Sequence, residues 1–483
     1  MNKTKSLQQV FEDYYKEKVE KIAALPASGS YREYYRLRVN DISAIGVYNF
    51  DKKENEAFLS FTRHFLSKDL PVPRIYSENL DQGVYLQEDL GDTTLFSKLN
   101  ELRTGDDFPI HAIEIYKKVL EQLPLFQVSG NEGLDYSVCY PRQKFDKQSM
   151  MWDLNYFKYY FLKLAKVPFD EQLLENDFMK FSDWLLEADN DYFLYRDFQS
   201  RNIMIQKGQP FYIDYQGGRK GALQYDVASL LFDAKADIPP SIKEELLEHY
   251  LEYLSRHIKV DTSSFKKFYY GFVLIRLMQA MGAFGFRGFY EKKSHFLASI
   301  PYAINNLTFL LNQYPLDIDL PHLEKVLNSL HDAPELKQFT DKKNHTGKLV
   351  VELNSFSYRR GIPVDLSENG GGFVFDCRAI HNPGRYEEFK QLTGKDSSVI
   401  TFLEKDSKAD QFVEDALTLV KPSICNYLDR QFTNLMVNFG CTGGQHRSVY
   451  CAEKMNTLLS KEFSDTIEIH LHHREEELKA LGI

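Results

Sequence analysis

Hydrophobic and polar residues follow two different arrangements along the chain. Residues 31–48 and 74–88 show the alternation and the β-branched and aromatic content of strands, and a helical period lies between them at residues 54–66. From residue 110 onward, apolar positions recur mainly at helical spacing. This order predicts a small sheet-based lobe followed by a helical lobe.

A polar segment containing Pro334 and Gly347 separates this region from a shorter pattern of strands and helices. Residues 434–440 predict a strand with alternate apolar side chains on one face, and residues 448–459 predict an amphipathic helix. We therefore expect an α+β bilobal domain over residues 1–330, a linker over residues 331–346 and a smaller α/β domain over residues 347–483.

Composition and charge narrow the class of protein. The chain has 483 residues, of which 43% are hydrophobic, as in ordinary globular proteins. Its five cysteines include no C-x-x-C pair, and its first residues contain no apolar signal-peptide core. The formal net charge of -10 argues against a main role in sequence-independent nucleic-acid binding. We expect a cytoplasmic protein that is not membrane-bound and for which nucleic acid is an unlikely partner.

The strongest chemical motif lies in residues 194–214, LYRDFQSRNIMIQKGQPFYID. Asp197 precedes Asn202 by five positions, and Asp214 ends an apolar strand twelve positions later. Phosphoryl transfer needs a carboxylate that accepts the proton of the attacking hydroxyl and oxygen ligands that hold Mg²⁺ against the phosphates. Asp197 suits the first role, and Asn202 and Asp214 suit the second. We interpret Asp226, at the start of the next helix, as an N-terminal cap that steadies this loop.

This region resembles the aminoglycoside phosphotransferase and choline kinase superfamily, and most closely the anomeric N-acetylmuramate/N-acetylglucosamine kinases of cell-wall recycling. The similar segments are residues 27–37, 70–95, 195–204, 212–234 and 277–286. The resemblance implies a protein-kinase-like fold, ATP and Mg²⁺ as cofactors, a phosphate-binding turn and an adenine-binding hinge. The turn would comprise Ser28, Gly29, Ser30 and Tyr31, and the hinge Gln87, Glu88, Asp89 and Leu90.

Two positions depart from that family. Tyr195 stands where the family usually has a histidine that braces the catalytic loop, so the brace must differ. The expected phosphate-neutralising lysine is missing from residues 45–48, IGVY, as it tends to be in the anomeric sugar kinases. Family kinases recognise the acceptor in the helical lobe, but aromatic residues at helical spacing are more often part of a core. The residues of interest there are Tyr140, Arg142, Asp146, Trp152 and Asp153.

A second motif, GCTGGQHRS, occupies residues 440–448 between the predicted strand and helix. A glycine-rich turn at a helix start directs backbone N–H groups toward an anion, and Arg447 and Ser448 add donors. The spacing also matches the C-x-x-G-x-x-R-S pattern of cysteine-dependent phosphatases, in which Cys441 would be the nucleophile. The motif therefore predicts a phosphate site, with phosphatase activity as an alternative.

Over residues 347–474 the stronger resemblance is to the C-terminal domain of the RNase adaptor family RapZ. It is carried by residues 355–365, 373–394, 399–406 and 440–455. The resemblance implies a sensor of glucosamine 6-phosphate, whereas the acidic tail REEELKALGI at residues 474–483 does not favour RNA binding. The implied ligand shell consists of Asp376, Arg378, Asn382, Cys441, Thr442, Gly443, Gly444, His446, Arg447 and Ser448.

Together these patterns predict an ATP-dependent sugar kinase joined to a regulatory module that binds an amino-sugar phosphate. The expected acceptor is an N-acetylated amino sugar of the N-acetylmuramate or N-acetylglucosamine type, phosphorylated at its anomeric hydroxyl. The alternatives are a non-catalytic nucleotide or phosphosugar sensor or adaptor, and a cysteine phosphatase in the second domain.

Overall fold

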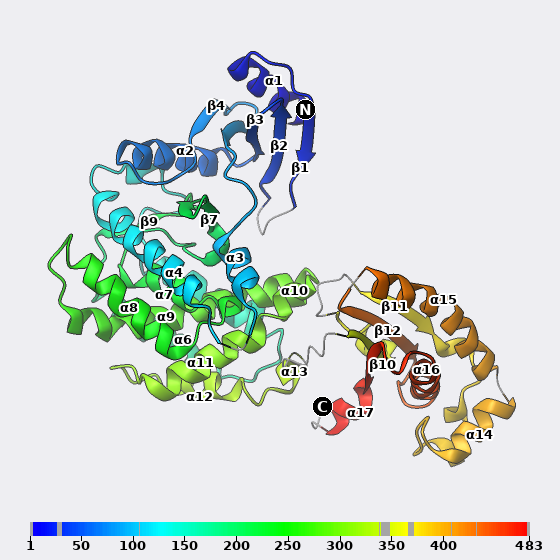
Figure 1. Ribbon diagram of the computed structural model, residues 1–483. Coiled ribbons are helices and arrows are strands. Elements are labelled where there is room, and N and C mark those ends of the chain that lie inside the picture. Colours follow the sequence, from blue (N-terminus) through cyan, green and yellow to red (C-terminus); the bar gives the residue numbers. More distant parts are fainter. Residues whose placement is uncertain are drawn as a thin grey trace. The chain divides into compact units, whose positions relative to one another are not determined.

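The computed structural model describes residues 3–26, 31–105, 107–337, 339, 348–365, 371–406, 408–430 and 432–480 (Figure 1). The chain divides into two compact units. The first comprises Met1–Lys163, Pro168–Gly282 and Tyr302–Asn328. The second comprises Leu164–Val167, Ala283–Pro301 and Ser329–Ile483.

The first unit begins with a five-stranded antiparallel sheet in the order β1-β2-β3-β5-β4. Its strands are β1 (Lys21–Ala24), β2 (Glu33–Val39), β3 (Ile42–Tyr48), β4 (Ile75–Asn79) and β5 (Val84–Glu88). Helix α1 (Lys3–Tyr15) buries Leu7 and Phe11 against Leu37, Ala44 and Leu86 of the sheet. The predicted strand-rich segments and the helix between them are confirmed, since α2 spans Lys52–Ser67.

Helix α2 starts where the sequence provides a cap. The Asp51 carboxylate accepts a hydrogen bond from the backbone N–H of Glu54, which satisfies one of the donors left open at a helix N-terminus. Ala57, Phe58, Phe61 and Phe65 are buried at helical spacing, so this face packs into the interior of the unit. The cap and the buried face fix the position of Glu54 in the first turn.

The remainder of the first unit is mainly helical, as the sequence predicts. Four short strands, β6 (Tyr192–Leu194), β7 (Ile203–Gln206), β8 (Gln209–Tyr212) and β9 (Arg219–Gly221), pair as β6-β9 and β7-β8. The longer helices of this part of the chain are α3 (Leu95–Leu102), α4 (Ile110–Pro124), α5 (Lys147–Phe157), α6 (Glu171–Leu185), α7 (Gln224–Leu231), α8 (Pro240–Leu254), α9 (Thr262–Gly285), α11 (Ile300–Gln313) and α12 (Pro321–Ser329).

The second unit contains a four-stranded sheet in the order β11-β12-β10-β13, with every neighbouring pair parallel. Its strands are β10 (Leu349–Ser357), β11 (Gly372–Asp376), β12 (Asn434–Cys441) and β13 (Ile467–His473). Helices α14 (Ser397–Asp406), α15 (Ala409–Asp429), α16 (Arg447–Phe463) and α17 (Arg474–Ala480) accompany the sheet (Figure 1). This is the smaller α/β domain that the sequence predicts.

Burial in the second unit confirms the predicted helix face and extends the predicted strand face. Val449, Ala452, Met455 and Leu459 of α16 are all fully buried. On β12, Met436 and Asn438 are buried as well as Leu435, Val437 and Phe439. A central strand of a parallel sheet is covered on both faces, so one-sided alternation does not describe β12.

Candidate functional sites

The residues predicted to act in phosphoryl transfer meet at one place in the first unit. The Asn202 amide nitrogen donates to the Asp197 backbone carbonyl at 2.9 Å and to Asp214 Oδ2 at 3.2 Å. The Ile213 N–H donates to the Asn202 carbonyl at 3.1 Å. The hairpin of β7 and β8 thus returns the chain to the loop that carries Asp197.

Tyr195 provides the brace that the sequence left undefined. Its side chain is fully buried, and its hydroxyl donates to the Ile213 carbonyl at 2.6 Å. Its ring makes edge contacts with Phe126, Phe198 and Tyr215. This contact joins the start of the catalytic loop to the residue before Asp214.

Asp226 holds the loop from a second side, although not as a helix cap. Its carboxylate accepts hydrogen bonds from the backbone N–H groups of Tyr195 and Arg196 at 2.8 and 3.0 Å. Helix α7 starts at Gln224 without a side-chain cap, so the predicted capping role is wrong, while the predicted effect on the loop is confirmed. Burial raises the pKa of Asp226 to about 7, against the lowering effect of these hydrogen bonds.

Arg196 adopts the left-handed conformation, with φ of 81°, which is uncommon for a residue other than glycine. Its guanidinium forms a two-pronged ion pair with Asp153 at 2.6 and 2.7 Å and also donates to the Tyr225 hydroxyl. These contacts, together with the backbone bond to Asp226, hold the unusual conformation that directs the next residue, Asp197.

The electrostatic setting of Asp197 suits a proton acceptor. Burial, and then the charge of Asp214, raise the pKa of Asp197, whereas Arg196, Arg276 and Arg219 act to lower it. Within the described residues no donor is hydrogen-bonded to the Asp197 carboxylate. A carboxylate whose pKa is raised and whose oxygens accept no hydrogen bond can take the proton of a bound hydroxyl.

Asn202 and Asp214 offer oxygen ligands that fit a magnesium ion. The Asn202 amide nitrogen is committed to Asp197 and Asp214, which leaves its oxygen for a cation. A neighbouring amide oxygen, Gln216 Oε1, is buried without a hydrogen bond, while the Gln216 nitrogen donates to Asp214 Oδ1 at 2.6 Å. The described residues contain no group of three or more His, Cys, Asp or Glu suited to a metal.

The predicted nucleotide-binding residues fall in two places. Ser28, Gly29 and Ser30 lie outside the described residues, and Tyr31, 78% exposed, begins the next segment. The hinge residues Gln87, Glu88, Asp89 and Leu90 follow one another at the end of β5.

Asp89 anchors the hinge through its side chain. Its carboxylate pairs with the Arg36 guanidinium, with Nε to Oδ2 at 2.8 Å, and also accepts hydrogen bonds from the Ser43 hydroxyl and the Gly91 N–H. The hinge is thereby tied to β2 and β3. The Asp89 carboxylate is occupied by these contacts, so an adenine bound at the hinge would use backbone groups.

The helical lobe presents aromatic side chains at its surface. Tyr140 is 39% exposed and Trp152 is 45% exposed, so neither belongs to the core that is the commoner place for such residues. The Arg142 guanidinium lies 5.8 Å from the centre of the Trp152 ring and pairs with Asp146. Asp153 is instead buried by its ion pair with Arg196.

Two buried arginines near Asp197 were not identified from the sequence. Arg219 is 7% exposed and its Nε donates to the Gly217 carbonyl at 3.0 Å. Arg276 is 9% exposed and donates to Ser229 Oγ and Gln279 Oε1. Neither forms an ion pair within the described part of the chain, and the local sequence carries no signal that would bring these two positions to Asp197.

The predicted phosphosugar residues of the second unit lie at the carboxyl ends of the parallel strands, where ligands bind in open α/β sheets. Asp376 ends β11 and Cys441 ends β12, and the two strands are neighbours. Arg378 Nη2 lies 2.7 Å from Asp376 Oδ2, and both side chains are about half exposed, at 53% and 44%. Asn382 caps a short turn by accepting the Gly384 N–H.

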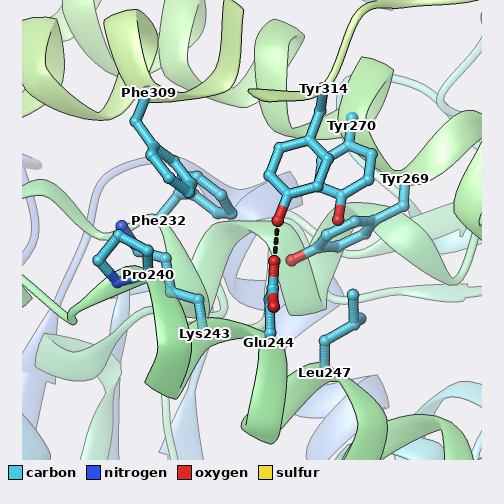
Figure 2. Close-up of a pocket in the computed structure, with 9 residues that line it drawn as sticks. All are labelled: Phe232, Pro240, Lys243, Glu244, Leu247, Tyr269, Tyr270, Phe309 and Tyr314. Atoms are coloured by element: carbon cyan, nitrogen blue, oxygen red, sulfur yellow. Dashed lines mark hydrogen bonds between the residues drawn. The ribbon is translucent and has the colours of Figure 1, made fainter. Parts of the chain in front are cut away.

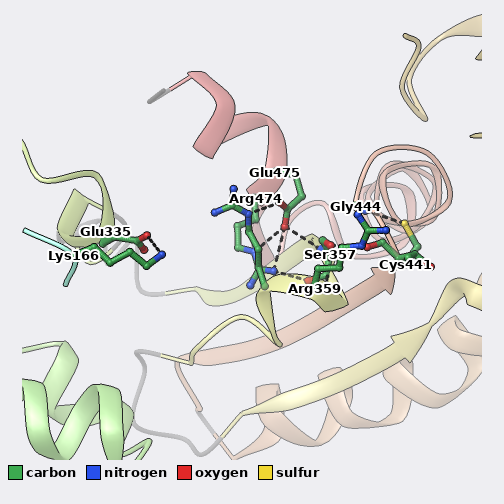
Figure 3. A network of polar contacts seen from close by, with 10 residues as sticks. Lys166, Glu335, Ser357, Arg359, Cys441, Gly444, Arg474 and Glu475 are labelled. Atoms are coloured by element: carbon green, nitrogen blue, oxygen red, sulfur yellow. Dashed lines mark hydrogen bonds and ion pairs between the residues drawn. The ribbon is translucent and has the colours of Figure 1, made fainter. Parts of the chain in front are cut away.

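The turn after β12 is held by polar contacts within the turn and with Ser357 at the end of β10 (Figure 3). The Gly444 N–H donates to Cys441 Sγ at 3.2 Å, and the Ser448 hydroxyl lies at the same distance from that sulfur. The Ser357 hydroxyl donates to the Thr442 carbonyl at 2.7 Å, while Glu475 accepts the Ser357 N–H. Thr442 and Gly443 are exposed, whereas Cys441 is only 3% exposed.

His446 and Arg447 are buried and bonded to backbone carbonyls. A ring nitrogen of His446 lies 2.8 Å from the Phe389 carbonyl. Arg447 Nη1 donates to the carbonyls of Arg378 and Ile380, both at 3.0 Å. Arg447 therefore links helix α16 to the segment that carries Arg378, and Arg378 is the more exposed cation of the pair.

A small cavity in the first unit lies away from these residues, between α8, α9 and α11 (Figure 2). Its volume of about 10 Å³ has room for one water molecule. Lys243 in its wall donates to Asn306 Oδ1, and burial lowers the pKa of Lys243 to about 8. The cavity is too small for a sugar or a nucleotide.

Two family models match the chain, one in each half. The Phosphotransferase enzyme family matches residues 47–259, and the RapZ C-terminal domain matches residues 349–477. Both predicted resemblances are confirmed at this level, and so is the α+β fold class of the first domain followed by an α/β domain.

Curated relatives match part of the chain. A nucleotide-binding protein of Acinetobacter baumannii is 32% identical over 154 residues, which cover 32% of this chain and 50% of that protein. A nucleotide-binding protein of Dinoroseobacter shibae is 35% identical over 145 residues, or 30% of this chain and 46% of that protein. The chain thus spans about half the length of these relatives.

Solved structures with a similar arrangement include two choline kinases. The enzyme of Streptococcus pneumoniae is 12% identical, with a TM-score of 0.43 over 64% of this chain and 99% of that one. The enzyme of Cryptosporidium parvum is 13% identical, with a TM-score of 0.45 over 67% of this chain and 99% of that one. In the described part of the chain, no helix combines the length and apolar character needed to cross a membrane.

Proposed function

We propose that the first unit is an ATP- and Mg²⁺-dependent small-molecule kinase. The observation that carries this proposal is the joined set of Asp197, Asn202 and Asp214, within a segment that matches a phosphotransferase family. ATP and Mg²⁺ supply the phosphoryl group and the neutralising charge. Asp197 holds the acceptor hydroxyl and takes its proton, while Asn202 and Asp214 hold the metal.

We further propose that the acceptor is an N-acetylated amino sugar, phosphorylated at its anomeric hydroxyl. The exposed rings of Tyr140 and Trp152 suit the apolar face of a sugar. Arg219 and Arg276 are buried near Asp197, and their hydrogen bonds within the described residues go to neutral groups, which suits an acceptor that carries a carboxylate. This favours an acceptor of the N-acetylmuramate type over the uncharged N-acetylglucosamine.

For the second unit we propose an amino-sugar phosphate as ligand, with glucosamine 6-phosphate as the specific candidate. The exposed Arg378 and the backbone of the turn at residues 441–448 offer donors to a phosphate at the carboxyl edge of the sheet. Asp376 can accept from an amino group. The burial of Cys441 does not favour the alternative of a cysteine phosphatase.

A screen of sugars with Mg·ATP tests the kinase proposal. ADP formation is measured with N-acetylmuramate, N-acetylglucosamine, glucosamine and choline, and phosphorus NMR identifies the phosphorylated position. Asp197→Asn is expected to reduce kcat by at least about a thousandfold while ADP affinity changes little, because the variant loses the proton acceptor and keeps the phosphate contacts. Turnover retained in Asp197→Asn contradicts the assigned base, and transfer to choline alone contradicts the sugar assignment.

A further inference from the structure

The acidic tail of the chain makes a specific contact with the end of strand β10 (Figure 3). Glu475 lies in the first turn of α17, and its side chain is 18% exposed. Its Oε1 accepts a hydrogen bond from the Ser357 N–H at 3.0 Å, and its Oε2 lies 3.2 Å from Arg360 Nε. The Nε and Nη2 groups of Arg474 also donate to Oε1, at 3.3 and 3.2 Å. Both oxygens of the carboxylate are thus occupied.

Ser357 is the residue through which α17 reaches the turn at residues 441–448. Its N–H is held by Glu475, and its carbonyl accepts a hydrogen bond from Arg474 Nη2 at 3.0 Å. Its hydroxyl donates to the Thr442 carbonyl at 2.7 Å. In the parallel pairing of β10 with β12, Ser357 lies opposite Cys441, the first residue of the turn. The backbone of Ser357 is therefore held by α17, and its side chain holds the turn.

Gly444, within the turn, packs directly on Glu475. Its φ of 69° is in the left-handed region that favours glycine. A Cβ atom at this position would overlap Glu475 Cγ and would lie 2.9 Å from the Ser357 nitrogen. The Gly444 N–H donates to Cys441 Sγ at 3.2 Å, so Gly444 lies between Cys441 and Glu475. The Glu475 side chain therefore forms part of the wall against which the turn folds.

The charge of Glu475 does not suit a direct contact with a phosphate. A carboxylate repels an anion, and the donors around this one come from Ser357, Arg360 and Arg474. An anion at the turn would instead be bound by backbone N–H groups and by the exposed Arg378. Any contribution of Glu475 to ligand affinity is therefore indirect, through the position of the turn.

We infer that Glu475 is a positioning residue for an anion bound at residues 441–448, and that it acts through Ser357 and Gly444. The inference rests on the proposed phosphosugar ligand of the second unit. It gives the C-terminal helix a function at that site, because α17 holds the turn in the shape that presents its N–H groups. Coupling between two positions is reciprocal, so a bound phosphosugar also stabilises α17.

Calorimetric titration of the full chain with glucosamine 6-phosphate tests the inference. Glu475→Ala is expected to weaken the affinity about tenfold or more, because the Ser357 N–H loses its acceptor and Gly444 loses its packing partner. A purely electrostatic effect has the opposite sign, since removal of a negative charge strengthens the binding of an anion. Glu475→Gln keeps the size of the side chain and an oxygen acceptor, and it is expected to recover part of the loss.

Glu477→Ala is the matched control, since Glu477 lies on the same helix, is 54% exposed and pairs with His472. It should bind glucosamine 6-phosphate as wild type does. Wild-type or tighter affinity in Glu475→Ala overturns the inference. A lower stoichiometry with unchanged affinity also overturns it, because a residue needed only for folding reduces the amount of folded protein and not the affinity of that protein.

If Glu475→Ala does not fold, amide hydrogen exchange of the wild-type chain decides. Glucosamine 6-phosphate is expected to slow exchange in α17, and unchanged exchange in α17 of the ligand-bound chain overturns the inference. A wild-type chain that binds no glucosamine 6-phosphate contradicts the proposed ligand itself, together with this inference.

Discussion

Single side chains determine the geometry of the proposed phosphoryl-transfer site. The Asp197 carboxylate makes no hydrogen bond within the described residues, so its position depends on neighbours such as Arg196 and Tyr195. Arg196 is held by Asp153, and Tyr195 is held by the Ile213 carbonyl. Substitutions of these supporting residues therefore test how the position of Asp197 affects catalysis.

Tyr195→Phe tests the brace. The variant leaves the Ile213 carbonyl without its donor, and we expect it to lower the free energy of unfolding by about 1–3 kcal/mol. We also expect kcat to fall about tenfold to a hundredfold, because Asp214 and Asp197 would no longer be held in register. Chemical denaturation and initial rates of ADP formation measure the two effects.

Tyr159→Phe is the control for this variant, since Tyr159 is 47% exposed and its hydroxyl makes a long contact of 3.5 Å with Glu171. Its unfolding free energy should stay within about 0.5 kcal/mol of wild type. A Tyr195→Phe enzyme with unchanged kcat would show that the hydroxyl is not needed for the geometry of the site.

At the level of elements, helix α7 supports the catalytic loop through one buried carboxylate. The pKa of Asp226 in the folded chain, about 7, lies above the ordinary value of 3.8. The folded state therefore binds the proton more tightly than the unfolded state, and stability falls as pH rises between these two values.

Asp226→Asn removes this titration. The variant is expected to be less stable than wild type at pH 5, because its NH2 group replaces one of the two carboxyl oxygens that accept from the loop N–H groups. The difference in unfolding free energy should shrink as pH rises from 5 to 8, because only wild type then carries a buried charge. Denaturant unfolding at several pH values measures it, with Asp81→Asn at an exposed site as control. A difference that grows with pH would refute the assignment.

The sequence predicted elements better than it predicted their connections. The helical period at residues 54–66 and the strand-like alternation at residues 31–48 are patterns of neighbouring residues. The sequence therefore predicted both the helix and the strands. The ends of α16 and β12 were also close to the prediction. Helix α1 and the edge strand β1 were not predicted; β1 has only four residues, none of them buried, and so carries little pattern of its own.

Contacts between distant residues explain the rest of what sequence reasoning missed. The motif spacing identified Asp197, Asn202 and Asp214 because these positions are close in the chain. Arg219 and Arg276 reach the same region from separate elements, and only the fold brings them together. Arg447 was likewise predicted to be a phosphate ligand because it lies in a glycine-rich turn. Its hydrogen bonds to the carbonyls of Arg378 and Ile380 depend on tertiary structure, so the sequence did not predict them.

For the whole chain, the two proposed sites predict that a ligand of the second unit changes the kinase rate. We expect glucosamine 6-phosphate to bind the full chain and to alter the rate of ADP formation, because coupling of two sites would let one amino-sugar metabolite regulate the other. Arg378→Ala should weaken this binding by about 1.5–3 kcal/mol and abolish the rate effect at the same ligand concentration. Calorimetry and a coupled ADP assay measure both.

Lys390→Ala is the matched control, since Lys390 is a half-exposed cation whose ammonium pairs with Glu387. It should leave both the affinity and the rate effect unchanged. Binding without any rate effect would contradict coupling while keeping the ligand, and equal affinity in wild type and Arg378→Ala would contradict the role of Arg378.

The parallel pairing in the second unit also affects the rate of folding. Leu349 of β10 pairs with Ile467 of β13, and Val350 pairs with Asn434 of β12, so this sheet closes long loops before any strand gains its neighbour. The antiparallel strands β2 and β3 of the first unit instead meet across a tight turn between Val39 and Ile42. Sheets built from distant segments form slowly. The nascent second unit therefore exposes unpaired strand edges for longer than the first and is the part of the chain more dependent on protection from aggregation.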